Sequence, residues 1–375
     1  MNTNRRNTFK LLGLVLTLGS LGMPAMADDD DDEGFRSGKV FVSTNAVAGN
    51  ELLVYAASNS GQLALQTRVA TQGLGTGTGL GNQGAVTFSG NERYLFVVNA
   101  LSNSVSTFSV RRNGLTLQST VPSGGERPIS VTEHGGIVYV LNAGGTGNVT
   151  GFRNDDGQLK PIANAVQPLS APSGTASAQV GFNNDGDVLV VTEKGTSKLT
   201  SYRVREGGRI DAPLVTASAG QTPFGFAFDR RDNLIVSEAF GGAPNSSAVS
   251  SYSFENWASA KPNVISASVA DGQSAACWVV VTPNGRYAYI TNTGSNTISS
   301  YAIQKSGKLT LVQSVAATTD AGPIDAALSP TGRSLFVLNS GSHTISSFTV
   351  DKDGNLTSAG SVGGLPVGAN GLAAN

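Results

Sequence analysis

Two glutamates stand at the ends of consecutive apolar stretches: Glu193 closes VLVVTE and Glu238 closes LIVSE. Two carboxylates beside a common opening can act as general acid and base, or can hold a cation together. We therefore expect Glu193 and Glu238 to be the catalytic pair if the protein is an enzyme. The alternative is that each carboxylate only pairs with Lys194, Arg127 or solvent.

Both glutamates belong to a strand ending that recurs seven times, at intervals of about fifty residues, which is typical of propellers and other repeat folds. The last residues of the copies are Asn45, Asn99, Asn142, Glu193, Glu238, Asn292 and Asn339. An asparagine at a strand end commonly holds the turning backbone, so the simplest role of the five asparagines is structural. The turn alone does not require the two glutamates.

The sixth unit shows how each repeat is built. Strand A (Cys277–Thr282) is apolar and is followed by a Pro-Asn-Gly turn and by strand B (Tyr287–Asn292). Asn-Gly supplies the positive φ that a tight hairpin needs. Strand C (Thr297–Ile303) alternates apolar and polar residues, and a Ser-Gly turn leads to strand D (Lys308–Ser314). Four antiparallel strands in each of seven units predict an all-β, seven-bladed β-propeller over residues 39–375.

The two ends of this domain are expected to meet. The first unit lacks a strand A, because Lys39–Asn45 begins directly as strand B. At the other end, Leu365–Ala374 resembles the strand A of the seventh unit. We therefore expect the C-terminal strand to pair beside Lys39–Asn45 and to close the ring. Closure hides two sheet edges that would otherwise promote aggregation.

The hairpin geometry indicates which rim of the propeller carries the function. Strand B returns antiparallel to strand A, so the start of A and the end of B share one rim, where seven loops converge on the channel. We expect the functional mouth there, with a small molecule as ligand. Besides the glutamate pair and Asp325, the residues expected at this mouth include seven that contact the ligand: Arg127, Asn142, Gln179, Phe224, Trp278, Asn292 and Asn339.

Other reactive side chains predict no further site. His134 falls in an A–B turn on the opposite rim, and His343 lies in a B–C loop displaced outward from the channel. Two histidines cannot build a histidine-rich metal site, so we expect no metal, and the sequence indicates no cofactor. Cys277 is the single cysteine, which excludes an internal disulfide, and we expect a buried thiol.

The first 38 residues are expected to precede the propeller. Three basic residues, the apolar run Leu11–Leu21 and the sequence Ala-Met-Ala at 25–27 predict a signal peptide over residues 1–27, of the general or the twin-arginine kind. The apolar run is too short to span a bilayer. Six consecutive acids begin residues 28–38, which predicts a disordered, solvated leader. We therefore expect a secreted or periplasmic protein.

Charge excludes some classes of partner. Without residues 1–27 the chain carries 22 basic and 26 acidic residues, a net charge of −4. This balance, with no basic stripe, argues against a nucleic-acid-binding protein and against binding to an anionic membrane surface. We expect a monomer without a membrane span.

The repeats resemble a known family. The strand ends similar to Tyr-Val-Thr-Asn, the Pro-led approach through Ser-Pro-x-Gly, and the Asp-Gly turns before strand D are similar to those of the seven-bladed propeller lactonase family. That family includes propeller-type 6-phosphogluconolactonases and carboxymuconate-lactonizing enzymes. The likeness covers essentially all of residues 39–375, and it implies a propeller with lactone chemistry at the channel.

The resemblance also has departures. The family's glutamate after an apolar strand corresponds to Glu238, but the Pro-Arg-His that leads that blade reads Thr-Pro-Phe at 222–224. The His-Gln of the preceding blade lies within Ser-Ala-Gln at 177–179, so only Gln179 is retained. With these cationic residues gone, little is left to bind a phosphate, and a phosphorylated sugar lactone is not expected as substrate.

Two classes of function follow. The first is an exported lactonase-like hydrolase that acts on a small, uncharged or weakly charged lactone. Glu238 or Glu193 would activate water, while Asn142, Gln179 and Asn292 polarise the carbonyl. The second is a non-catalytic propeller of the periplasm or cell surface, which binds a ligand, a glycan or a protein at its rim or serves as a scaffold.

Overall fold

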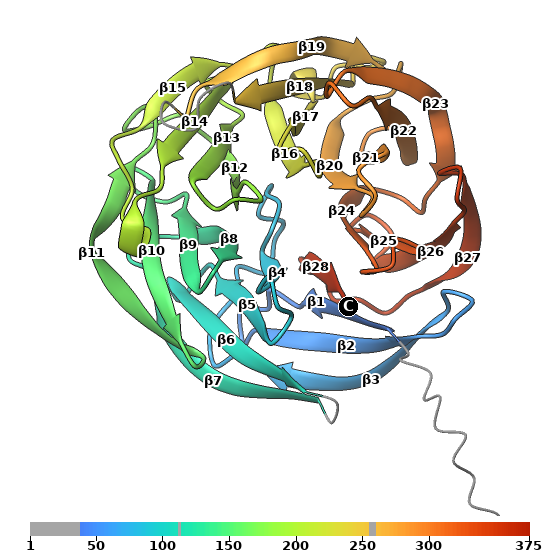
Figure 1. Cartoon of the computed structure of the whole chain (residues 1–375). Helices are drawn as coiled ribbons and strands as arrows, with labels where there is room; N and C mark the ends of the chain where they lie inside the picture. The colour runs from blue at the N-terminus through green and yellow to red at the C-terminus, as the bar shows by residue number, and fades with distance from the viewer. Residues whose placement is uncertain (1–37, 112–113, 255–259) are drawn as a thin grey trace, which may run out of the picture. The chain divides into compact units, whose positions relative to one another are not determined.

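The computed structural model describes residues 38–111, 114–254 and 260–375. The expected signal peptide and all but the last residue of the expected leader lie outside these ranges. Gly38, assigned to the leader from the sequence, is the first residue of strand β1 (Gly38–Ser43). The described residues form seven four-stranded antiparallel sheets, arranged as the blades of a propeller (Figure 1). The predicted fold class is confirmed.

The first two strands of each blade form the inner part of the ring. The inner strands, A, are β28 (Asn370–Ala374), β4 (Val86–Phe88), β8 (Pro128–His134), β12 (Ser177–Phe182), β16 (Pro223–Phe228), β20 (Ala276–Val281) and β24 (Pro323–Leu328). The second strands, B, are β1, β5 (Tyr94–Asn99), β9 (Ile137–Asn142), β13 (Val188–Glu193), β17 (Leu234–Glu238), β21 (Tyr287–Asn292) and β25 (Ser334–Asn339).

The last two strands of each blade form its outer part. The third strands, C, are β2 (Glu51–Ala57), β6 (Ser104–Arg111), β10 (Asn148–Asp155), β14 (Lys198–Arg203), β18 (Ala248–Phe254), β22 (Thr297–Ile303) and β26 (Thr344–Val350). The outer strands, D, are β3 (Leu63–Ala70), β7 (Gly114–Pro122), β11 (Gln158–Pro168), β15 (Leu214–Ala217), β19 (Pro262–Ala270), β23 (Leu309–Thr318) and β27 (Leu356–Val362). Two single-turn 3₁₀ segments, Glu206–Gly208 and Phe240–Gly242, lie in the connections.

The ring closes as the sequence predicts. The C-terminal strand β28 is the inner strand of the first blade and pairs antiparallel with β1, with Val40 opposite Ala374 and Val42 opposite Leu372. Beyond the strand, the backbone of Asn375 exchanges two hydrogen bonds with Lys39, of 3.0 and 3.1 Å. In Figure 1 the red end of the chain therefore lies beside its blue beginning. The inner edge of β1 is therefore covered by β28.

The core lies between neighbouring blades. Strand β21 buries Ala288, Tyr289 and Ile290, so both faces of the strand are covered. Tyr289 packs in one cluster with Leu335 of the next blade. Removing such a side chain from water contributes about 1.5–3 kcal/mol. The sequence shows the B strands as nearly continuous apolar runs because each blade is enclosed by two neighbours.

The described part of the chain contains no helix long and apolar enough to cross a membrane.

Candidate functional site

Four of the five strand-end asparagines bond within their own blades, whereas Asn45 donates to Thr76, Thr78 and Gly368 in the loops before β4 and β28. In three blades the Asn side chain donates to a hydroxyl of strand C seven residues later: Asn99 to Ser106 (2.8 Å), Asn292 to Ser299 (2.8 Å) and Asn339 to Ser346 (2.9 Å). In the third blade, Asn142 Nδ2 donates to Asn148 Oδ1 at 2.8 Å. These four asparagines are fully buried. They hold the B–C connections together, which is the structural role that the sequence favours.

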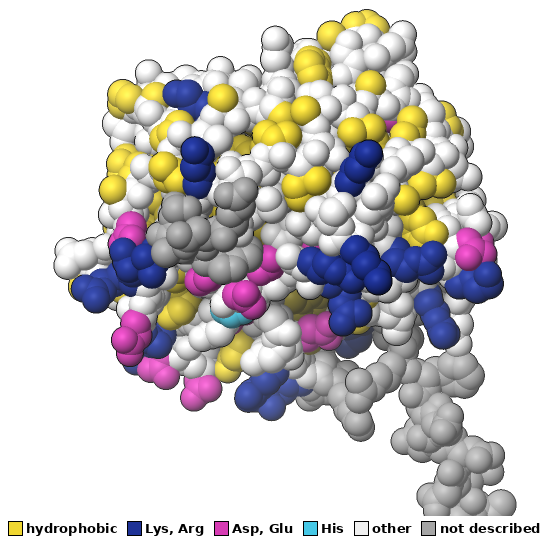
Figure 2. All heavy atoms as spheres, turned by 45° about the horizontal axis from the view of Figure 1, so that its top comes forward, with side chains coloured by type: hydrophobic (Ala, Val, Ile, Leu, Met, Phe, Trp, Pro, Cys, Tyr) yellow, Lys and Arg dark blue, Asp and Glu magenta, His cyan; other side chains and the backbone are white. Residues whose placement is uncertain are grey.

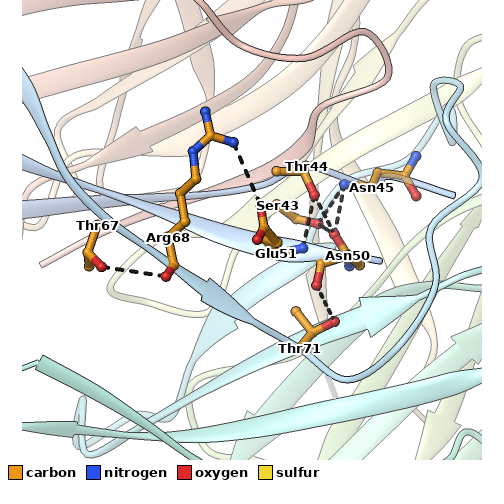
Figure 3. A network of polar contacts seen from close by, with 8 residues as sticks. All are labelled: Ser43, Thr44, Asn45, Asn50, Glu51, Thr67, Arg68 and Thr71. Atoms are coloured by element: carbon orange, nitrogen blue, oxygen red, sulfur yellow. Dashed lines mark hydrogen bonds and ion pairs between the residues drawn. The ribbon is translucent and has the colours of Figure 1, made fainter. Parts of the chain in front are cut away.

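The first blade shows how densely this rim is bonded (Figure 3). The Asn50 side-chain oxygen accepts three hydrogen bonds, from Ser43 Oγ (2.8 Å), Thr44 Oγ1 (3.2 Å) and the Asn45 backbone N–H (2.8 Å). Thr71, in the connection to the next blade, donates to the Asn50 carbonyl at 2.9 Å. The polar side chains at this rim are therefore engaged in positioning loops.

Glu193 occupies the same place in the fourth blade. It is fully buried, and its carboxylate accepts hydrogen bonds from Thr200 Oγ1 (2.7 Å) and Thr196 Oγ1 (2.8 Å). The backbone N–H of Ser170 donates to it at 2.9 Å, and the Ser170 hydroxyl donates as well. The Glu193 side chain is longer than that of asparagine and reaches Ser170 in the loop that enters the blade. A carboxylate, which only accepts hydrogen bonds, can accept from all four of these donors.

Glu238 repeats this arrangement in the fifth blade. The backbone N–H of Gly220 donates to it at 2.8 Å, Ser268 Oγ donates at 2.6 Å, and Ser250 Oγ donates too. The residue is fully buried, and burial raises the pKa of Glu238 although these three groups lower it. The structure thus places each predicted catalytic carboxylate inside its own blade, out of contact with solvent. The catalytic role of the pair stays a prediction, and this geometry does not favour it.

A charged group that does lie at the mouth is the ammonium of Lys194. The Lys194 ammonium lies 4.4 Å from the centre of the Phe224 ring, which belongs to the next blade. Burial lowers the pKa of Lys194, and the positive charge of Arg127 lowers it further, whereas Cys277 opposes the shift. Arg127 is exposed and begins the third blade with a φ of 52°. The sequence predicts Arg127 and Phe224 at the mouth but does not predict Lys194 there. In the structure, Lys194 contacts Phe224 and is affected by the charge of Arg127.

Lys194 could have been found from the sequence. The residue after the strand ending is small in the six other copies: Ala46, Ala100, Ala143, Ala239, Thr293 and Ser340. A lysine at this position is unusual for the repeat, and its long side chain can extend over the channel. In the B–C and D–A loops, all of which the structure describes, the only basic residues other than His343 are Lys194 and Arg127. On the face drawn in Figure 2, Lys, Arg, Asp and Glu side chains lie mainly in one band.

A loop closes the channel at this rim. Residues 79–84, here called the plug, precede β4 and run into the middle of the ring (light blue in Figure 1). They bond to the inner strands of three other blades: Asn82 Nδ2 to Ile129 O, Gln83 N to Ala178 O (3.0 Å) and Gln83 Nε2 to Val279 O (3.1 Å). The Lys194 ammonium donates to the Gly81 carbonyl. Lys194 therefore lies on the plug, and a ligand at this rim would meet both.

Two further predicted residues lie in the wall of the channel. Gln179 links two inner strands, since its Nε2 donates to Phe226 O at 3.0 Å and its Oε1 accepts from Phe226 N at 2.6 Å. Trp278 is 3% exposed and lines the channel. Cys277 is a buried thiol, as expected, and burial raises its pKa to about 12. Among the described residues, no group of three or more His, Cys, Asp or Glu side chains could hold a metal ion.

Comparison with known proteins identifies the family. The model of the "Lactonase, 7-bladed beta-propeller" family matches residues 48–171, 146–257 and 245–368, which together span most of the propeller. The chain belongs to the seven-bladed β-propeller lactonase family. No curated protein matches the sequence significantly.

Solved structures of similar shape include enzymes assigned to lactone chemistry. A putative 6-phosphogluconolactonase of Bacteroides fragilis is 17% identical, with a TM-score of 0.72 over 92% of this chain and 100% of its own. The periplasmic gluconolactonase of Pseudomonas aeruginosa is 20% identical, with a TM-score of 0.70 over 89% of this chain and 98% of its own. A protein of Lactobacillus plantarum is 17% identical, with a TM-score of 0.72 over 90% and 99%. At these identities the likeness establishes the shared fold.

The mouth of this member of the lactonase family differs from what the resemblance implies. The sequence Thr-Pro-Phe at 222–224 replaces the Pro-Arg-His that the family resemblance leads one to expect, and the Phe224 ring receives a cation from the preceding blade. The positive charge at this part of the rim thus comes from Lys194, at the end of strand B, rather than from the start of strand A.

Proposed function

We propose that this lactonase-family protein hydrolyses a small, uncharged or weakly charged lactone at the rim formed by the B ends, and that Lys194 is the residue that engages the lactone carbonyl. The observation that carries the proposal is the position of the Lys194 ammonium, over the Phe224 ring beside the channel axis and within electrostatic reach of Arg127. The family supplies the reaction class.

Lactone hydrolysis develops negative charge, which the cations Lys194 and Arg127 can stabilise. Water adds to the lactone carbonyl, the ring C–O bond breaks, and the products are a carboxylate, a hydroxyl group and a proton. Negative charge develops on the carbonyl oxygen as water adds, and an ammonium placed there stabilises it. In this proposal Arg127, whose positive charge acts on Lys194, binds the carboxylate that forms through the paired N–H groups of its guanidinium.

In this proposal Glu193 and Glu238 hold the blades. Each already accepts at least three hydrogen bonds and has no contact with solvent, so neither is placed to take a proton from a water at the rim. The same reasoning applies to Asn142, Asn292 and Asn339, which are buried in their blade networks. Phe224 remains a ligand contact because its ring carries the ammonium.

A proton-release assay with simple γ- and δ-lactones tests the proposal. We expect the wild type to hydrolyse at least one neutral lactone and Lys194→Met to reduce kcat/KM about 100-fold, since losing a group that stabilises the developing oxyanion typically costs that much. Lys308→Met is the matched control, because Lys308 is exposed in a C–D turn on the opposite rim. Equal rates for wild type and Lys194→Met would refute the assignment.

The second candidate is a non-catalytic ligand-binding propeller. The plug favours it, because the plug closes the channel at the same rim and already accepts a hydrogen bond from the Lys194 ammonium. This candidate predicts no hydrolysis of any lactone in the panel, together with binding of a carboxylate ligand that Lys194→Met abolishes. Titration calorimetry with gluconate distinguishes the two outcomes.

We further propose that the protein acts outside the cytoplasm. The basic start, the apolar run Leu11–Leu21 and the Ala-Met-Ala at 25–27 support export. The Pseudomonas aeruginosa gluconolactonase, which shares the fold, is a periplasmic protein, and this supports the same location here. N-terminal sequencing of the mature protein should begin at Asp28, and recovery of the intact N-terminus from the cytoplasmic fraction would refute export.

A further inference from the structure

The plug makes the central channel a pocket with one opening. Gln83 reaches across the axis to Val279, and Gly225 leaves room for it, since a Cβ on Gly225 would lie 2.0 Å from Gln83 Oε1. Gln83 and Gly84 also line the remaining cavity, which has a volume of about 390 Å³ and includes residues of all seven inner strands. The plug is therefore the floor of this cavity at the end where the A strands begin.

The cavity opens at the opposite rim. Its lining extends to residues at the far ends of the inner strands: Phe88 of β4, Phe182 of β12, Phe228 of β16 and Ala374 of β28. Asn184, in an A–B turn, also belongs to the lining. A molecule would enter between the A–B turns, on the side away from Lys194. This cavity is thus separate from the proposed hydrolase site at Lys194.

The lining selects uncharged, flat molecules. None of the residues that line the cavity is charged, so an ion entering it would lose water without gaining a counter-charge. Three half-buried phenylalanines, Phe88, Phe182 and Phe228, line the cavity near the opening, and their rings also pack edge-on against other aromatic rings of the core. Deeper groups such as Thr132 and Gln179 are polar but neutral. The volume lies within the range of about 300–1,000 Å³ that small-molecule pockets occupy.

We propose that this channel pocket is a second binding site, entered from the A–B turns, for a small uncharged molecule with a planar ring and a carbonyl group. Aromatic surface at the opening suits the ring, and the amide and hydroxyl groups further in suit the carbonyl. The proposal does not depend on the hydrolase assignment, because the plug separates the two sites.

Trp278 provides a built-in reporter. It lines the pocket, and the chain has two tryptophans, so Trp257→Phe leaves Trp278 as the single one. The probe is coumarin, an uncharged bicyclic aromatic lactone, and the matched probe is coumarin-3-carboxylate, which adds one negative charge. We expect saturable quenching of Trp278 by coumarin and at least tenfold weaker binding of the carboxylate. The absence of saturable quenching, or equal affinity for the two probes, overturns the proposal without the need for any pocket variant.

Two variants locate the site. Ala327→Leu adds bulk to the pocket wall and should weaken coumarin at least tenfold, whereas Phe228→Leu removes a ring at the opening and should weaken it about fivefold. Thermal unfolding of both variants checks that the propeller is intact. Lys194→Met shows at which rim coumarin binds. If coumarin binding is lost in Lys194→Met and kept in Ala327→Leu, the ligand binds on the Lys194 side of the plug. The channel-pocket proposal would then be wrong.

Discussion

Asp325 should make the stability of the ring fall as the pH rises. It lies on β24 next to the closing strand β28, is fully buried, and has no hydrogen-bond partner of normal geometry for either carboxylate oxygen. The backbone N–H groups of Ala326, Leu372 and Gly371 are near enough to favour the charged form, but burial prevails and raises the pKa of Asp325 well above its usual range. An unfolded aspartate has a pKa of about 3.9.

The magnitude follows from proton linkage. Between the unfolded and the folded pKa, the folded protein holds a proton that the unfolded chain has released. The free energy of unfolding then falls by about 1.4 kcal/mol per pH unit. Asp325→Asn removes this titration, so its stability relative to wild type should rise with pH above about pH 4, by up to about 1.4 kcal/mol for each pH unit that lies between the two pKa values. Glu238 and Asp271, whose pKa values burial also raises, contribute equally to both proteins and cancel.

The assay is urea unfolding followed by circular dichroism at several pH values. Asp353→Asn is the control, because Asp353 is an exposed carboxylate in a C–D turn, and its profile should run parallel to that of wild type. If the difference between Asp325→Asn and wild type is the same at pH 4.5 and pH 6.5, Asp325 is ionised in the folded protein. Burial would then not keep the Asp325 side chain protonated in the folded protein.

The plug, the thiol and the closing strand can each be tested. Gly225→Ala should destabilise the fold by about 1–3 kcal/mol, because the added methyl group would overpack against Gln83. Gly79→Ala is the control, since its Cβ would meet nothing within 4 Å, and equal melting temperatures of the two variants would contradict the packing of the plug. Iodoacetamide at pH 8 should leave Cys277 unmodified in the native protein and alkylate it in urea, as mass spectrometry can show, because burial raises the pKa of its thiol to about 12. Deleting residues 370–375 exposes the inner edge of β1 and should cause aggregation on size-exclusion chromatography; a monomer that melts like wild type would refute closure by β28.

The fold can be predicted from the sequence because the same pattern of strands and turns recurs along the chain. Strand endings such as those at Asn292 and Asn339, preceded by an Asn-Gly and a Thr-Gly turn, fix both the strand order and the blade count. The missing first strand and the unmatched C-terminal one predict the closure by β28. Local patterns determine these features, so no knowledge of distant contacts is needed.

The site was harder to predict because its geometry depends on where side chains point. Position in the repeat places Glu193 and Glu238 on the correct rim, yet their orientation is set by hydroxyl groups in strands C and D and by the entering loops. A strand-end residue followed by Ser or Thr seven positions later, as in Asn292 and Ser299 or Glu193 and Thr200, is a signal of that structural network. Read in this way, the sequence would have favoured blade stabilisation for Glu193.

The plug could not be predicted from local patterns. Its glycine-rich sequence indicates a loop, but the bonds from Gln83 to Ala178 and Val279 join residues that lie far apart in the chain. They exist only because the ring brings the inner strands of different blades to one axis. The side on which the channel is open is therefore a property of the closed propeller.

The most direct test of this account compares lactone hydrolysis by Lys194→Met with hydrolysis by the double variant Glu193→Gln/Glu238→Gln, each rate normalised to folded protein. We predict that Lys194→Met loses about 100-fold in kcat/KM, whereas the double variant stays within about threefold of wild type and shows only a changed melting temperature. The reverse ranking, with the double variant inactive and Lys194→Met unaffected, would contradict the account and return the chemistry to the two glutamates.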